Sequence, residues 1–359
     1  MPIPTVGQLT PPRSARRWLP KRVAFTRDAY AHAHGRRIAE RVTALGLPVE
    51  VLKGNRLSGL RGKDEKETYR ISKNTFALKI APPGEFRLTP IPPSADWQFH
   101  LAKGCPAHCQ YCYLAGSLSG PPVIRAFANL PEILENTKLY VQPDQAVTTY
   151  EASCYTDPLG IEHLTGSLAH TIEFFGQQPN QRLRWVTKYD DVDQLLDLQH
   201  NGHTRCRISL NTDMIGRRLE GGTANIAARI RALRKLALPK SEGGGGYPIG
   251  IVLAPIMPLD NWQEEYGALL DAVRHALDFD IDLTFELISH RFTPGSKNVL
   301  LNWYPHTPLD MEESTRSQKR NKFGGVKFVY PKTQMTDLKG WFHERIGTQF
   351  PSARILYWT

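Results

Sequence analysis

The sequence has few cysteines and no long apolar run. Its five cysteines include a single C-x2-C pair, Cys109 and Cys112, where zinc sites usually have two such pairs. An odd number of cysteines also does not fit a disulfide framework. A transmembrane helix needs about 18 consecutive apolar residues, and no stretch approaches that length. The start, Met1 to Thr5, lacks a hydrophobic signal region. These absences predict a cytoplasmic protein in a reducing compartment, with no membrane partner.

Acidic residues are outnumbered by basic ones. The chain has 45 Lys and Arg against 35 Asp and Glu, which gives a net charge of +10 and a predicted pI near 9.4. Residues 1–70 alone contain 15 basic and 6 acidic residues, a difference of nine out of the ten excess charges. This distribution favours a polyanionic partner. A solvated basic arm that serves only solubility is the alternative.

The order of predicted elements indicates an α/β fold. Residues 1–94 are predicted to form a basic N-terminal arm and a small α/β cap, residues 95–290 the main domain, and residues 291–359 a C-terminal hairpin and helix. Six strands alternating with helices predict a parallel sheet with right-handed crossovers. The predicted strands are 97–101, 146–152, 183–189, 205–211, 249–256 and 282–288, and the predicted helices lie near 124–139, 161–175, 191–199, 223–237 and 261–278.

Chemically informative side chains follow the predicted strands. A cysteine-rich loop follows the first strand, Cys154 the second and Lys188 the third, while Ser209 lies near the end of the fourth and His290 follows the sixth. In parallel α/β sheets, functional residues gather at the carboxyl ends of the strands. We therefore expect these residues to meet at one edge of the sheet.

The cysteine-rich loop has the spacing of a metal-ligand motif. Cys105, Cys109 and Cys112 form C-x3-C-x2-C, which allows three thiolates to hold three irons of a [4Fe-4S] cluster and leaves the fourth iron open. Pro106 prevents a helix through the first half of the loop, and Gly104 permits a tight exit from the strand. A zinc site completed by His108 or a more distant histidine is the alternative.

Several motifs together resemble one family. The cysteine motif followed by an aromatic residue is similar to the signature of the radical S-adenosylmethionine superfamily, and the run 105–114 resembles that of spore photoproduct lyases. Further similar segments are Glu151-Ala152-Ser153-Cys154, Thr187-Lys188-Tyr189, Ile208-Ser209-Leu210-Asn211 and the run 286–293. The resemblance spans roughly residues 95–330 and implies a partial, open (β/α)6 barrel of the radical S-adenosylmethionine type.

The resemblance implies roles for particular residues. Lys188, Ser209 and Thr156 are expected to hold polar groups of S-adenosylmethionine, although family members tend to have serine at position 156. Cys154 is expected to return a hydrogen atom to the substrate radical, with Tyr111 and Tyr113 as a radical relay. A lone cysteine is otherwise most often a small buried core residue, so that alternative stays open for Cys154. Cys206 has no trusted counterpart in the family and is predicted to be core.

The C-terminal part contains a basic and aromatic segment, residues 319–330. Two glycines, Gly324 and Gly325, divide it and predict a β-hairpin. Its cations would suit phosphates and its aromatic rings would suit exposed bases. An edge hairpin with ordinary surface lysines is the alternative. The predicted nucleic-acid contacts are Lys319, Arg320, Lys322 and Phe323.

The resemblance implies a DNA repair lyase that converts 5-thyminyl-5,6-dihydrothymine in damaged double-stranded DNA to two thymines. It also implies a [4Fe-4S] cluster, S-adenosylmethionine and an external reductant of the flavodoxin or ferredoxin type. Two alternatives remain at this point: a lyase-like enzyme for another photoproduct, such as a (6-4) or Dewar lesion, and a non-catalytic iron–sulfur or zinc protein that binds nucleic acid.

Overall fold

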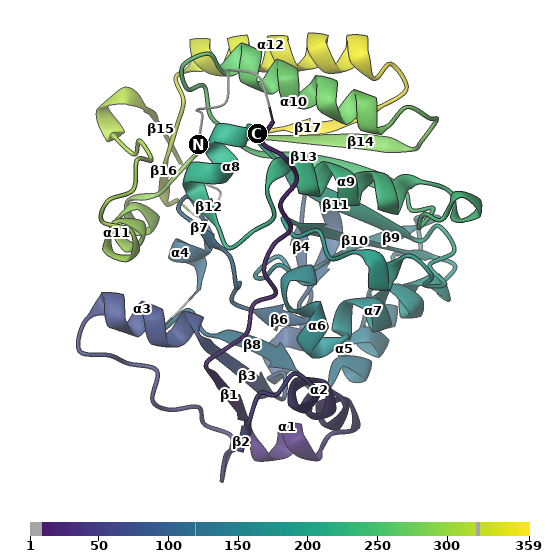
Figure 1. The fold of residues 1–359 in the computed structure, drawn as a ribbon, viewed down its shortest axis with the longest axis vertical. Helices are drawn as coiled ribbons and strands as arrows, with labels where there is room; N and C mark the ends of the chain where they lie inside the picture. The colour runs from purple at the N-terminus through teal and green to yellow at the C-terminus, as the bar shows by residue number, and fades with distance from the viewer. Residues whose placement is uncertain (1–8, 119, 321–323) are drawn as a thin grey trace.

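A large, mostly parallel sheet forms the centre of the molecule (Figure 1). The computed structural model describes residues 9–118, 120–320 and 324–359. The order of strands in the sheet is β17-β14-β13-β11-β10-β9-β5-β4, and all neighbours are parallel except the pair β4 and β5. The strands are β4 (Thr89–Ile91), β5 (Ala95–Phe99), β9 (Thr148–Ala152), β10 (Gln181–Thr187), β11 (Thr204–Leu210), β13 (Ile249–Ile256), β14 (Leu283–Ser289) and β17 (Arg354–Trp358).

The sheet is curled, as contacts across its inner face show. Arg184 on β10 forms an ion pair with Glu286 on β14, although β11 and β13 separate these two strands. Three strand spacings in a flat sheet would put the two backbones about 14 Å apart. Curling brings the inner side chains together, so the sheet forms a half-barrel whose end strands, β4 and β17, do not pair with each other.

The two faces of the sheet differ in composition. Leu183 and Trp185 on β10, like Cys206 on β11, are fully buried and belong to the main hydrophobic core. Their neighbours in the strands, including Arg184 and Arg207, have the opposite parity and face the inside of the half-barrel. Burial of the apolar set under the helices is the main contribution to this domain's stability, at about 25 cal/mol per Å² of apolar surface.

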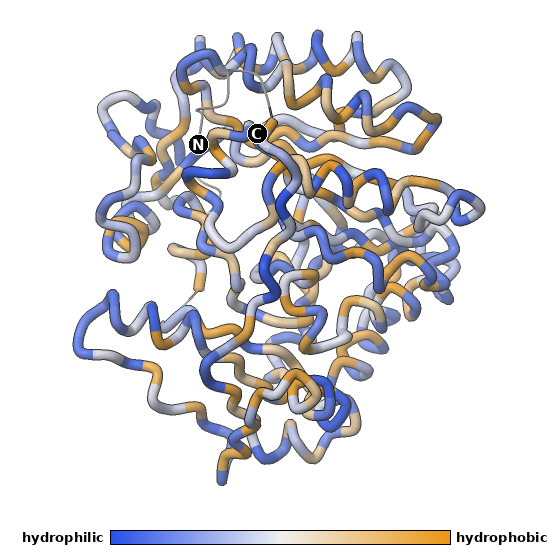
Figure 2. The backbone as a smooth tube through the Cα atoms, in the orientation of Figure 1, coloured by the Kyte–Doolittle hydropathy of each residue, from blue (hydrophilic) through white to orange (hydrophobic). Residues whose placement is uncertain are grey.

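Helices cover the outside of the half-barrel. They are α5 (Leu130–Thr137), α6 (Glu162–Thr165), α7 (Ser167–Gly176), α8 (Asp213–Leu219), α9 (Ile226–Ala237), α10 (Trp262–Ala276) and α12 (Lys332–Gln349), with the short α4 (Leu114–Ser117) and α11 (Pro294–Trp303) beside the barrel opening. In α10, hydrophobic and hydrophilic residues alternate along the helix (Figure 2), as expected of a helix with one packed face. No helix in the described ranges is long and apolar enough to cross a membrane.

All six predicted parallel strands are confirmed, with ends shifted by a few residues. Two helix predictions need correction. Residues 124–127 form a strand, β8, so that the helix there is only α5, and the predicted helix at 191–199 is a single 3-10 turn at Asp193–Leu195. The seventh parallel strand, β17, was not predicted, because a short amphipathic run after a long helix carries no distinctive signal.

A smaller sheet lies below the half-barrel in Figure 1. Its order is β2-β1-β3-β8-β6, and it has a separate hydrophobic core. The elements are β1 (Arg22–Phe25), β2 (Val49–Val51), β3 (Thr75–Lys79), β6 (Ala102–Lys103) and β8 (Ile124–Phe127), packed with α1 (Arg27–Ala31), α2 (Ala33–Ala44) and α3 (Glu65–Lys73). The three-part division of the chain stays a prediction, and strand pairing crosses both of its boundaries, since β6 and β8 join the small sheet and β17 the large one.

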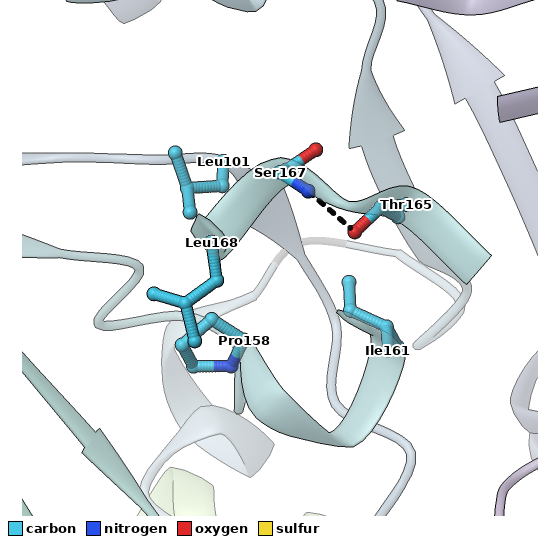
Figure 3. A pocket seen from close by; sticks show the side chains of 6 residues that line it. All are labelled: Leu101, Pro158, Ile161, Thr165, Ser167 and Leu168. Atoms are coloured by element: carbon cyan, nitrogen blue, oxygen red, sulfur yellow. Dashed lines mark hydrogen bonds between the residues drawn. The ribbon is translucent and has the colours of Figure 1, made fainter. Parts of the chain in front are cut away.

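The two sheets meet at the segment that follows β9. There, Ser167 donates its backbone N–H to the Thr165 hydroxyl at 3.2 Å, beside a narrow apolar crevice (Figure 3). The crevice has no room for a water molecule. Its lining comprises Leu101, Pro158, Ile161, Thr165, Ser167 and Leu168. The joint is therefore a packed contact rather than an open cleft.

The predicted basic N-terminal arm passes the carboxyl ends of the strands of the half-barrel and then enters β1 (Figure 1). Thr10 donates its hydroxyl to Asp213 at 2.6 Å, and the backbone N–H groups of Arg13 and Ala15 bond Asn225 at 2.8 Å and Asp190 at 3.0 Å. These partners lie at the ends of strands or at helix starts near the barrel opening. The described part of the arm is thus anchored by specific side chains.

The predicted C-terminal hairpin is confirmed. Strands β15 (Ser317–Arg320) and β16 (Val326–Val329) pair antiparallel, with Lys319 opposite Lys327. An isolated bridge between Phe292 and Phe328 joins the hairpin to the segment after β14, and their rings stack with centroids 5.3 Å apart. The hairpin is therefore held beside the carboxyl end of the large sheet.

Candidate active site

The cysteine-rich loop leaves the small sheet at β6 and returns to it at β8. Gly104 has a φ of +85°, and a Cβ there would lie 2.3 Å from the carbonyl oxygen of Val123, so only glycine fits this turn. Its N–H donates to the Tyr155 carbonyl at 2.8 Å, which fixes the loop next to the segment after β9. Farther on, His108 and Cys109 (β7) pair with Glu220 and Gly221 (β12).

The three predicted ligand cysteines lie together in this loop, and their thiols are free. Burial raises the pKa of Cys105 and Cys109 to about 12 and that of Cys112 to about 11. Thiolates in such a site need cationic iron to compensate their charge, which fits a cluster bound by three cysteines. The cluster itself stays a prediction.

The zinc alternative would use His108. Its Nδ1 is hydrogen-bonded to the Tyr69 hydroxyl at 2.8 Å. A single zinc ion needs a compact set of ligands, and in the described part of the chain no three His, Cys, Asp or Glu side chains, the loop cysteines included, form such a group. In a [4Fe-4S] cluster each cysteine binds a different iron, so the three thiols need not converge on one atom.

The structure brings together two of the predicted cofactor residues, Lys188 and Ser209. Lys188 donates its Nζ to Ser209 Oγ at 2.8 Å and to Glu220 Oε1 at 2.9 Å. Burial opposes the ionisation of Glu220, but Arg229 and Lys188 overcome it and lower its pKa to about 2. Glu220 therefore stays ionised and fixes Lys188 beside the cysteine loop. Sequence reasoning missed Glu220, because it precedes a Gly-Gly turn and matches no quoted motif.

The third predicted cofactor residue, Thr156, has a buried hydroxyl with no protein partner among the described residues. A buried unpaired hydroxyl costs free energy unless a ligand bonds it. Next to it, Asp157 accepts the Lys188 backbone N–H and the Thr187 hydroxyl, both at 2.7 Å, which ties the Cys154 segment to the end of β10. The unsatisfied Thr156 oxygen and the Ser209 hydroxyl are a fitting set for a polar cofactor such as S-adenosylmethionine.

Cys154 lies at the turn directly after β9. Ser153 before it has a φ of +62°, and the turn is closed by hydrogen bonds from the Ser153 N–H to Phe99 and from the Thr156 N–H to Ser153. Burial and the neighbouring Glu151 carboxylate, which accepts a hydrogen bond from the thiol, raise the pKa of Cys154 well above its usual range. The thiol therefore keeps its hydrogen at neutral pH.

The two predicted relay tyrosines contact different parts of the site. Tyr113 donates its hydroxyl to the carbonyl of Cys154, and Tyr111 donates to Glu220. The Lys188 ammonium lies 5.5 Å from the centre of the Tyr111 ring. Tyr113 is thus adjacent to Cys154, and Tyr111 is adjacent to the predicted cofactor residues.

A buried ionic network occupies the inner face beneath Cys154. Arg207 pairs with Glu151 and, at 2.8 Å, with Glu286, which also pairs with Arg184 and accepts the Tyr357 hydroxyl at 2.5 Å. Gly250 makes room for it, since a Cβ there would lie 2.7 Å from Arg207 Cγ. The network positions Glu151, the hydrogen-bond partner of the Cys154 thiol.

Comparison with known proteins identifies relatives over nearly the whole chain. A sequence model described as spore photoproduct lyase matches residues 18–359. The chain belongs to the spore photoproduct lyase family. Relatives include the spore photoproduct lyases of a Geobacillus species, 38% identical, and of Bacillus subtilis, 36% identical, each aligned over 95% of this chain and 99% of the relative.

Solved structures of spore photoproduct lyase superpose closely. One complex with dinucleoside spore photoproduct has a TM-score of 0.89 and 36% sequence identity, covering 96% of this chain and all of that one. A variant with bound AdoMet and dinucleoside spore photoproduct has a TM-score of 0.88 with the same identity and coverage. The predicted radical S-adenosylmethionine type of half-barrel is confirmed, with β17 as an addition to its six predicted strands.

The remaining predicted residues of this spore photoproduct lyase family member lie outside the cofactor region. Lys319 and Arg320 are exposed on β15, whereas Lys322 and Phe323 fall outside the described residues. Cys206 is completely buried on the outer face of β11, so its assignment as a core residue is confirmed.

Proposed function

We propose that this chain repairs 5-thyminyl-5,6-dihydrothymine in DNA by cleaving the methylene bridge and restoring two thymines. Cys105, Cys109 and Cys112 would hold a [4Fe-4S] cluster, and Lys188, Ser209 and Thr156 would bind S-adenosylmethionine. When bound, these groups supply a carbon-centred radical that starts the cleavage by hydrogen abstraction from the lesion. An external reductant of the flavodoxin or ferredoxin type would provide the electron.

The protein's own contribution is the return of a hydrogen atom. After the bridge breaks, the Cys154 S–H gives its hydrogen to the thymine radical, which forms a C–H bond and leaves a sulfur-centred radical. Tyr113 next to it can then give its phenolic hydrogen to that sulfur, and Tyr111 continues the relay toward the cofactor residues. The hydrogen bond from the Tyr113 hydroxyl to the backbone carbonyl of Cys154, which holds the phenol next to this residue, is the observation that supports this order.

Base access requires that both thymines leave the duplex, which costs a few kcal/mol and less for a damaged pair. The hairpin lies at the same end of the large sheet as Cys154 and exposes Lys319 and Arg320. We assign these two side chains to phosphate contacts in double-stranded DNA. Replacing each by alanine should lower the salt dependence of DNA binding by about one phosphate contact per residue. Lys138→Ala, an exposed lysine paired with Glu135, is the matched control.

The main experiment is anaerobic reconstitution with iron and sulfide, reduction with dithionite, and incubation with S-adenosylmethionine and lesion oligonucleotides. We expect restored thymines and 5′-deoxyadenosine with the spore lesion. Turnover only of (6-4) or Dewar oligonucleotides would instead assign another photoproduct, and salt-dependent binding without product would indicate a binding protein.

Cys154→Ala tests the hydrogen donor. The bridge should still break, but the thymine radical should be quenched by other reactants and give aberrant products. Cys206→Ala is the matched control, because Cys206 is a buried cysteine on the outer face of the same sheet. A product distribution that is unchanged in Cys154→Ala would contradict the assignment.

A further inference from the structure

A buried lysine of the small domain contacts the cysteine-rich loop. Lys73 is the last residue of α3, is 6% exposed, and donates its Nζ to the backbone carbonyls of Cys105 and Ala107. Tyr69, one helical turn earlier, bonds His108 in the same loop. Helix α3 therefore contacts the loop through two side chains on one face.

Lys73 has no carboxylate partner among the described ion pairs. Burial lowers the pKa of Lys73, and the ionisable groups that oppose this shift and favour the charged form are Cys105, Cys112 and Cys109. Two neutral carbonyls satisfy hydrogen bonds, but they do not replace a counter-ion, and an unpaired buried ammonium is strongly unfavourable. The missing negative charge would be present once the three cysteines bind a cluster as thiolates.

We propose that Lys73 is the counter-ion of the iron–sulfur cluster and that it raises the cluster's reduction potential. Net charge and hydrogen bonding around a cluster set its potential. Reduction adds one negative charge next to a fixed cation in a buried site, so the cation stabilises the reduced state more than the oxidised one. The inference rests on the proposed cluster at Cys105, Cys109 and Cys112.

The experiment compares midpoint potentials of reconstituted proteins by EPR-monitored redox titration, together with iron content. Lys73→Met removes the charge and the hydrogen bonds, Lys73→Gln removes the charge and keeps a donor, and Lys73→Arg keeps the charge. We expect a potential shifted to more negative values in the Met and Gln variants and close to wild type in the Arg variant.

Lys103→Met is the matched control. Lys103 immediately precedes the loop, but its Nζ is paired with Glu85 at 2.6 Å, so its removal should leave the potential unchanged. Thermal unfolding of the iron-free proteins separates the effect of the Lys73 charge on the cluster from any effect of its side chain on packing. Without a cluster, the buried ammonium lacks a counter-ion, so Lys73→Met should unfold at the same temperature as wild type or higher.

Each outcome is decisive. An unshifted potential in Lys73→Met, a wild-type potential in Lys73→Gln, or a marked loss of stability of iron-free Lys73→Met would overturn the proposal. If both neutral variants lose iron, retention of iron by Lys73→Arg supports the counter-ion role. Loss of iron from Lys73→Arg as well refutes that role and shows that the shape of the lysine side chain, rather than its charge, is what the loop requires. A wild-type protein that binds no cluster would instead refute the proposed function.

Discussion

Replacement of Arg207 by methionine tests the ionic network beneath Cys154. The side chain of Arg207 is 2% exposed, and those of its partners Glu286 and Glu151 are 1% and 8% exposed. Removing one partner of a buried pair costs roughly 3–5 kcal/mol, because the remaining charge stays desolvated. Arg207→Met leaves Glu286 with Arg184 and leaves Glu151 without a cationic partner, so we expect a loss of about 4 kcal/mol at pH 7.

The control is Arg205→Met, two residues earlier on the same strand and face. Arg205 pairs with Asp282, whose side chain is 50% exposed, and such solvent-exposed pairs contribute about 0.2–1 kcal/mol. The assay is urea unfolding of the iron-free proteins followed by circular dichroism, with equal m-values as the criterion that both variants unfold in the same way.

The loss of stability caused by Arg207→Met should depend on pH in a definite direction. Burial opposes ionisation of Glu286, but Arg207 and Arg184 lower its pKa below the usual value, so the wild type loses this stabilisation as the pH falls. In Arg207→Met that carboxylate has lost one cation and takes up a proton more readily in the folded state. The difference in free energy of unfolding between Arg207→Met and wild type should therefore become smaller as the pH is lowered from about 8 to about 5. A cost no larger than that of Arg205→Met, or a gap independent of pH, would refute the reasoning.

Three further variants probe neighbouring features. Gly250→Ala should cost about 1–3 kcal/mol in urea unfolding, because the new methyl group would displace the pinned Arg207, and a neutral result would show that Arg207 can move. Burial raises the pKa of Glu162 to about 7, so wild type should lose stability relative to Glu162→Gln as pH rises from about 4.5 to 7; parallel pH profiles would contradict this. Tyr113→Phe should slow repair and change stability by no more than about 1 kcal/mol, and unchanged turnover would exclude Tyr113 from the relay.

The six central strands could be predicted because each is a short apolar or alternating run flanked by turn residues, apolar at 249–256 and alternating at 181–187. The residues of the site could be predicted to converge because the carboxyl ends of parallel strands share one edge. The membership of the short strands β6 and β8 in a second sheet could not be predicted, since two to four residues carry no clear period.

The partners of the predicted site residues were also beyond sequence reasoning. Glu220 lies 108 positions after Cys112, and Lys73 lies 32 positions before Cys105, yet both contact the site formed by the cysteine loop. The sequence around either residue contains no motif that would predict this contact. Four consecutive glycines at 243–246 by themselves suggest a flexible segment, but each of their N–H groups bonds a backbone carbonyl, and a Cβ at Gly244 would lie 2.2 Å from the Leu238 carbonyl oxygen. Close backbone packing, rather than flexibility, accounts for the glycines.

The cysteine loop begins on β6 and ends on β8, and these are paired neighbours in the small sheet. Its two ends are therefore held together by main-chain hydrogen bonds whatever happens between them. Without the proposed cluster the loop would stay attached at both ends, and Ala107, Cys109 and Ala115 within it would still pack in the main hydrophobic core. Loss of the proposed cluster would then be a local event, and the same polypeptide could be reloaded without being unfolded and refolded.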